Sequence, residues 1–132
     1  MKNNSWNDME DEEAEYALAI GYLQTAISLL HPKLWAFVKR IAPVDPALTA
    51  KQPDFAFSLK FVRQNWEGYF LGKCPASLKR IAERAERIRN IVSHQARLED
   101  PDRALDTLAR LAVGIGEEKL AEKIRSLRRV PQ

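Results

Sequence analysis

Apolar residues recur along this chain at intervals of three and four, and this spacing constrains the fold more than any other feature. The clearest case is the segment from Ser77 to Arg97, in which no Gly or Pro interrupts a run rich in Ala, Arg and Glu. Its apolar positions form one seam of a helix, at Leu78, Ile81, Ala85, Ile88 and Val92. No stretch of the chain alternates between apolar and polar residues as a half-buried strand does, so we predict an all-α bundle of about five helices.

The first helix is expected to begin in the acidic stretch 8–15, where a helix N-terminus favours negative charge, and to end at Ile41. His31 and Pro32 predict a kink or a short break within it, because the residue before a proline avoids the α region. The polar residues 1–7 are expected to be disordered.

The remaining helices follow from capping residues and turn signals. Asp54 and Asp100 are suited to N-caps, and Pro101 to a first helical position. The proline-rich segment 42–53 predicts a loop, and residues 129–132 a loose tail. The expected helices run from Asp54 to Phe70, from Ser77 to Arg97, from Asp100 to Gly114, and from Glu117 to Arg128.

The size and residue usage indicate one domain over residues 1–132. No apolar run reaches the length of a membrane span, and no signal peptide is visible, so the expected location is the cytoplasm. The single cysteine, Cys74, excludes an intramolecular disulfide and fits a reducing compartment. Two scattered histidines and one cysteine do not form a zinc site.

Charge is distributed unevenly along the chain. Residues 1–15 hold six acids and one base, so the rest of the chain holds 20 bases and 12 acids. Between Lys60 and Arg97 there are nine bases and three acids. A basic middle is compatible with a polyanionic partner such as RNA, although an ordinary solvated helix surface would look the same by charge alone.

Three stretches, taken in order, resemble the motifs of the HEPN superfamily. They are the segments Asn65–Phe70, Glu86–Gln95 and Asp102–Leu111, the last followed by Ile115 and Gly116. The middle stretch carries the signature of an Arg, a polar residue after it and a His a few positions later. The sequence of these stretches is similar to the HEPN branch typified by the C-terminal domain of a fungal nuclear RNA quality-control endoribonuclease, and to its bacterial relatives. The resemblance implies a HEPN-like helical bundle.

By this resemblance the chain would cleave RNA without a metal or another cofactor. The ribose 2′-OH would attack the adjacent phosphate and leave a cyclic phosphate and a 5′-OH end. His94 would act as acid, base or phosphate ligand, Arg89 would stabilise the charge on the phosphate oxygens, and Asn90 would position them. Ser93 is a weaker candidate contact. Arg84, Arg87 and Arg97 are candidate RNA-binding residues.

The geometry of the signature suggests a second copy of the chain. Asn90 and His94 are one turn apart, but Arg89 and His94 diverge by about 140° on an ideal helix. Convergence needs a long Arg side chain, a distorted helix end or a homodimer, and HEPN domains commonly pair their signatures across a two-fold axis. Ala96 stands where HEPN toxins paired with a nucleotidyltransferase carry a Tyr, which disfavours that class. A role in stress or phage defence, beside an associated ATPase or another protein, is an expectation from the relatives.

Two other functions remain open at this point. The chain could be a non-catalytic HEPN module that dimerises and binds RNA or a partner protein, or a structural helical adaptor. In the adaptor, Arg89 would pair with Glu86 or with an acid of another helix, and His94 would oppose the helix dipole. His31 is expected to be structural, Cys74 to be inert, and the aromatic residues to be core: Trp35, Phe61, Trp66 and Phe70.

Overall fold

The computed structural model describes residues 4–49 and 53–129 of the chain. Within these ranges there are six α-helices, five of them with nine residues or more, and no strand. The helices are α1 (Asn4–Ile41), α2 (Pro46–Thr49), α3 (Phe55–Gln64), α4 (Leu78–Ser93), α5 (Pro101–Gly114) and α6 (Glu118–Ser126). A π-helical turn, η1 (Trp66–Phe70), follows α3, and a 3-10 turn, η2 (Leu127–Arg129), follows α6. The prediction of an all-α bundle of about five helices is confirmed.

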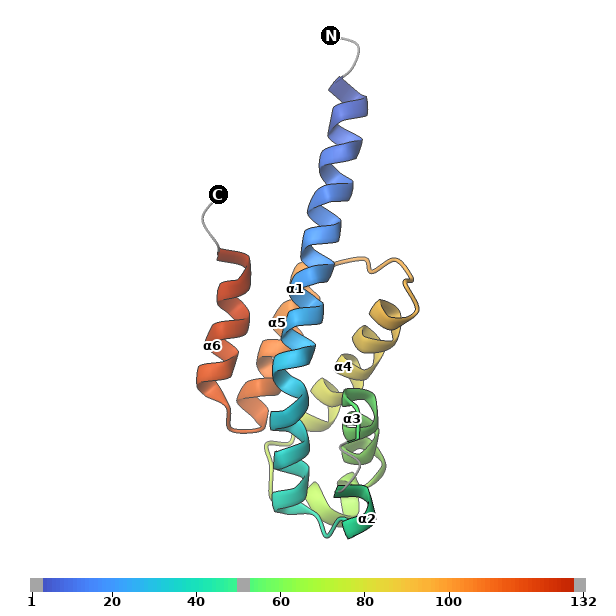
Figure 1. The fold of residues 1–132 in the computed structure, drawn as a ribbon. Helices are drawn as coiled ribbons and strands as arrows, with labels where there is room; N and C mark the ends of the chain where they lie inside the picture. Colours follow the sequence, from blue (N-terminus) through green and yellow to red (C-terminus); the bar gives the residue numbers. More distant parts are fainter. Residues whose placement is uncertain (1–3, 50–52, 130–132) are drawn as a thin grey trace.

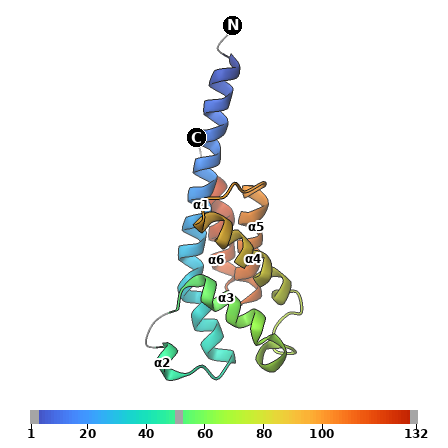
Figure 2. The ribbon, with the colours of Figure 1, turned by 90° about the vertical axis from the view of Figure 1, so that its right-hand side faces the viewer.

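The long helix α1 runs the full length of the bundle (Figure 1). Helices α3 and α5 both pack on α1, α4 packs on α3 and α5, and α6 folds back on α5. Figures 1 and 2 show that the N-terminal part of α1 extends beyond the other helices. From Glu10 onward, Leu23 is the first buried side chain of α1, so residues 10–22 add little to the fully buried core.

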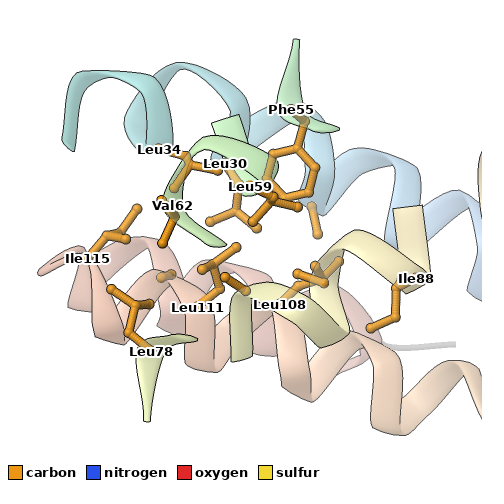
Figure 3. Packing of buried hydrophobic residues seen from close by; sticks show 14 of the residues in the cluster. Leu30, Leu34, Phe55, Leu59, Val62, Leu78, Ile88, Leu108, Leu111 and Ile115 are labelled. Carbon is orange, nitrogen blue, oxygen red and sulfur yellow. The ribbon is translucent and has the colours of Figure 1, made fainter. Parts of the chain in front are cut away.

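The core lies where α1, α3, α4 and α5 meet (Figure 3). It contains fully buried leucines from three helices, including Leu30 and Leu34 of α1, Leu59 of α3, and Leu108 and Leu111 of α5. Each buried side chain of this size stabilises the fold by about 1.5–3 kcal/mol before entropy is counted. Trp35, Trp66 and Phe70 are buried and Phe61 packs against the core, as the sequence predicted.

A kink or a short break was expected at Pro32, and the break is wrong, because α1 continues through this residue. Proline removes one helical hydrogen bond, at a cost of about 3 kcal/mol or more in a helix interior. Leu30 and Leu34 lie on either side and are almost fully buried, so core packing holds both turns in line. His31 keeps a structural role, since its Nε2 lies 2.7 Å from the carbonyl oxygen of Pro53.

Several predicted boundaries also differ from the structure. Helix α1 begins at Asn4, so residues 4–7 are helical rather than disordered, and it starts before the acidic stretch. The expected loop 42–53 contains the short helix α2. The helix predicted to reach Phe70 ends at Gln64 and gives way to η1, which places Trp66 and Phe70 both in the core, with their rings stacked. Residue 129 belongs to η2, while residues 1–3 and 130–132 lie outside the described residues.

Both predicted N-caps are confirmed. The Asp54 side chain accepts a hydrogen bond from the Phe57 N–H, and Asp100 accepts one from the Arg103 N–H. Pro101 occupies the first turn of α5, as expected for a residue without an N–H to satisfy. These caps fix where α3 and α5 begin and therefore where their side chains meet α4.

Candidate functional site

The signature residues lie at the C-terminal end of α4, which ends four residues earlier than predicted. Helix α4 stops at Ser93, with His94 as its C-cap. Gln95 follows with a φ of +57°, its N–H bonds to the Val92 carbonyl, and the Ala96 N–H bonds to the Ile91 carbonyl. This pair of bonds is the Schellman motif. The chain therefore turns sharply just after His94.

The buried seam of α4 also differs slightly from the expected one. Leu78, Ala85 and Ile88 are buried as predicted, and Ala82 joins them, while Ile81 and Val92 are only half-buried. The change follows from the partners of α4, since α3 and α5 cover it from two sides. Arg89 lies beside this seam at the end of the helix.

Arg89 is held toward the N-terminus of α3. Its Nη2 lies 3.8 Å from Asp54 Oδ2, and its Nη1 donates a 3.4 Å hydrogen bond to Asn90 Oδ1. Both contacts are long, and the side chain is 29% exposed. The acid nearest to Arg89 is therefore Asp54, the N-cap of α3, and not Glu86 of its own helix.

Glu86 has another partner. It accepts hydrogen bonds of 2.9 and 3.3 Å from the Arg63 guanidinium of α3. This hydrogen bond and the attraction of the Glu86 charge raise the pKa of Arg63 above its ordinary value. The bidentate pair joins α3 to α4 about one turn before Arg89 and does not include it.

Asn90, Ser93 and His94 are exposed. The Ser93 and His94 side chains make no hydrogen bond or ion pair with any described residue, and Asn90 accepts only the bond from Arg89. No hydrogen bond joins the side chains of Arg89 and His94 within the described part of one chain. The turn at Gln95 does not bring them together, so a single chain presents an open His and an Arg directed elsewhere.

A second group of predicted residues converges where α4 faces the start of α5. Arg84, Arg87 and Arg97 line a hollow of about 480 Å³ between α4 and the start of α5. The hollow also includes Arg103, which the sequence reasoning did not select. The basic charge of Arg103 was visible in the sequence, but its place opposite Arg87 depends on how α5 folds back beside α4.

Arg97 is also anchored to α1. Its Nη1 lies 3.0 and 3.2 Å from the two carboxylate oxygens of Glu13, and its guanidinium carbon lies 3.8 Å from the centre of the Tyr16 ring. The neighbouring Leu98 N–H donates a 2.8 Å hydrogen bond to the Tyr16 hydroxyl. The loop after His94 is therefore fastened to the base of the protruding part of α1.

No group of three or more His, Cys, Asp or Glu side chains among the described residues could hold a metal ion. Cys74 is a partly buried free thiol, and burial raises its pKa above the ordinary value. A raised pKa lowers the thiolate fraction, which is the opposite of what a nucleophilic cysteine needs. No described helix is both long enough and apolar enough to cross a membrane.

Comparison with known protein families agrees with this arrangement. The model of the Swt1-like HEPN family matches residues 30–116, which is more than half of the 132-residue chain. The chain belongs to the Swt1-like HEPN family. The matched region contains the end of α4 with Arg89, Asn90 and His94, whereas α6 and the protruding part of α1 lie outside it. No curated protein and no solved structure matches the chain.

Membership of the HEPN superfamily indicates a ribonuclease or an RNA-binding module, and HEPN domains commonly bind RNA and form dimers. The structure offers two basic regions for such a role. One is the signature end of α4, and the other is the arginine-lined hollow between α4 and α5.

Proposed function

We propose that this HEPN protein is a metal-independent endoribonuclease whose active site forms in a homodimer. The observation that carries the proposal is the open end of α4, where Asn90, Ser93 and His94 are exposed beside the half-exposed Arg89. An imidazole can accept and donate a proton, and an Arg neutralises charge on a phosphate. The location that we infer is the cytoplasm, and the inferred setting is stress or phage defence.

Cleavage would use the RNA's own 2′-OH as the nucleophile. A base removes its proton, the oxygen attacks the adjacent phosphorus, and an acid protonates the leaving 5′ oxygen. The products are a 2′,3′-cyclic phosphate and a 5′-OH end, and no water or metal enters the first step. His94 would supply one of the two proton transfers, Arg89 would stabilise the phosphate oxygens, and Asn90 and Ser93 would position the phosphate.

A second copy of the chain would complete this site. Arg89 is drawn to Asp54, and it diverges from His94 by about 140° around α4. Two α4 ends that meet across a two-fold axis would place His94 of one copy near Arg89 of the other, and would also supply two histidines for the two proton transfers. A partner ATPase or another protein could regulate such a dimer.

The second candidate function is a non-catalytic module that dimerises and binds RNA or a partner protein. The separation of Arg89 and His94 in one chain favours it, because no interaction among the described residues brings these two side chains together. The two candidates differ in one respect that can be measured. Only the first produces cyclic-phosphate ends.

The test is a cleavage assay on mixed single-stranded and structured RNAs with EDTA present. Wild type is compared with His94→Ala and Arg89→Ala, and with Lys119→Ala as an exposed charge-removal control on α6. Circular dichroism first establishes that each variant is folded. Cleavage by wild type and the Lys119 variant alone, with cyclic-phosphate ends, supports the endoribonuclease. Equal cleavage in every sample points to a contaminant, and RNA binding without cleavage favours the second candidate.

A further inference from the structure

Two neighbouring hollows follow the contact between α4 and α5 and share one residue, Arg84. The first has a volume of about 480 Å³, and the second, of about 470 Å³, lies toward the start of α4 and the end of α5. We call the arginines of α4, of α5 and of the loop between them that line these hollows the arginine groove: Arg80, Arg84, Arg87, Arg97, Arg103 and Arg110. Arg125 of α6 also lines the second hollow, where it pairs with Asp106 at 3.6 Å. The groove runs along the side of the bundle from the α4–α5 loop.

The helices that form the groove are antiparallel and close. A Cβ at Gly114, near the end of α5, would lie 2.8 Å from Leu78 Cδ1 at the start of α4. Arg87 and Arg103 therefore line one hollow and Arg80 and Arg110 line the other. Seven residues of helix separate Arg80 from Arg87, a distance of about 10 Å along the axis. The site is elongated, which suits a ligand with repeated negative charges better than a single phosphate.

Most of this positive charge is not neutralised within the chain. Among the described residues, the side chains of Arg80, Arg84, Arg87 and Arg103 have no hydrogen-bond or ion-pair partner. Arg80, Arg84 and Arg87 also follow one another at intervals of four and three on the same helix, where like charges repel. The surface thus concentrates cations that an external polyanion would neutralise.

The two arginines of the groove that do have partners lie on its borders. Arg97 pairs with Glu13 of α1, and Arg110 pairs with Asp106 one turn earlier in α5 at 3.0 Å. Two acids line the first hollow beside its four arginines: Asp100, which is occupied in capping α5, and Glu99, which pairs with no described residue. The centre of the groove, around Arg84, therefore remains basic.

The shape of the groove favours a single strand over a duplex. Axes of packed helices are about 8–10 Å apart, so a hollow between two helices is too narrow to receive a double helix. Guanidinium groups bind phosphate oxygens through two parallel N–H bonds. The residues that line the two hollows, all in the described part of the chain, include aliphatic side chains such as Ile91 but no aromatic ring for base stacking. Little sequence preference is expected from such a surface.

We propose that the arginine groove binds the sugar–phosphate backbone of single-stranded RNA, as an extended site distinct from Arg89 and His94. The proposal rests on the RNA-directed function and specifies its substrate. Arg87 and His94 are seven residues apart, which brings them within about 20° of the same face of α4. A strand that follows the groove past Arg87 is thereby directed toward His94.

The test measures the binding of a fluorescein-labelled 12-nucleotide oligouridylate by anisotropy. The His94→Ala variant is the background, so that the RNA stays intact. Arg84→Gln is expected to weaken binding about five- to tenfold, because Arg84 lines both hollows, and to reduce the slope of log Kd against log salt by about 0.7. Arg40→Gln on α1 is the matched control, since Arg40 lies outside both hollows and its guanidinium lies over the Phe37 ring of its own helix.

Other outcomes separate this proposal from the proposed function. A double variant, Arg87→Gln with Arg103→Gln, is measured in the same His94→Ala background. If wild type cleaves RNA but the Arg84 variant and the double variant bind the oligonucleotide as tightly as the His94→Ala protein does, the groove assignment is overturned and the endoribonuclease stands. If these variants lose binding while no sample cleaves RNA, the groove stands and the endoribonuclease fails. A 12-base-pair duplex that binds as tightly as the single strand overturns the single-strand assignment. If the protein binds an acidic peptide with the sequence of residues 8–19 more tightly than it binds the oligouridylate, the RNA assignment is overturned in favour of a protein ligand.

Discussion

The guanidinium carbon of Arg97 lies 3.8 Å from the centre of the Tyr16 ring, so a residue of the α4–α5 loop rests on the long helix α1. The same guanidinium pairs with Glu13, and the Tyr16 hydroxyl accepts the Leu98 N–H. These contacts join residues more than 80 positions apart. They fix the direction in which the chain leaves His94.

Tyr16→Phe is expected to destabilise the protein by about 1 kcal/mol, because the Leu98 N–H loses its acceptor in a partly buried place. Urea unfolding monitored by circular dichroism measures the change. Tyr22→Phe is the matched control, since no hydrogen bond joins the Tyr22 hydroxyl to a described residue. An equal loss in both variants would show that the bond to the loop contributes nothing specific.

Gln95→Gly is expected to stabilise the protein by about 1 kcal/mol, because the φ of +57° is strained for any residue with a Cβ. The Schellman turn and the position of His94 would be preserved. Thermal unfolding should show a rise in Tm of a few degrees. Gln95→Val should lower Tm, because a β-branched residue tolerates this conformation least. A Gly variant less stable than wild type would mean that the Gln95 side chain makes a compensating contribution.

Cys74 gives a prediction about pH. Burial raises its pKa in the folded protein, so above the ordinary cysteine pKa of about 8.5 the folded state keeps a proton that the unfolded state has released. The free energy of unfolding must therefore fall as pH rises through the interval between the two pKa values. The free energy of unfolding, measured by urea between pH 7 and pH 10, should decline less steeply with pH in Cys74→Ala than in wild type. Parallel curves would show that the thiol is not the group responsible.

The end of α4 illustrates what sequence reasoning could and could not provide. Helix α5 ends in the same motif as α4, with Gly116 in place of Gln95 at the left-handed position, and that end was predicted from the glycine. Gln95 gives no such signal, because its conformation is imposed by the anchoring of the following loop on α1. The same limit applies to Pro32, where core packing outweighed a local preference.

Some features of the candidate site could likewise be predicted from the sequence, and others could not. The divergence of Arg89 and His94 follows from helix geometry and could be calculated from their spacing alone. The partner of Arg89 could not be predicted from spacing, because Asp54 comes from another part of the chain and was recognised only as a cap. Arg103 was missed for a related reason, since its place beside Arg87 depends on the antiparallel pairing of α4 and α5.

Asp54 has two roles that one substitution can separate. It caps α3 through the Phe57 N–H, and its charge attracts Arg89 from 3.8 Å. Asn caps helices about as well as Asp, so Asp54→Asn should keep α3 intact and change the free energy of unfolding by less than about 0.5 kcal/mol. Asp54→Ala loses the cap as well and should cost about 1 kcal/mol.

In the Asp54→Asn variant Arg89 is released from its nearest acid. If Arg89 stabilises the phosphate as proposed, this variant should bind and cleave RNA a few-fold better than wild type, because the guanidinium no longer has to leave a carboxylate. Glu67→Gln removes the same charge from an exposed residue of η1 and should leave both properties unchanged. Initial cleavage rates and anisotropy at fixed salt measure the two effects. A loss of activity in Asp54→Asn would instead mean that the Asp54 carboxylate holds Arg89 in its working position.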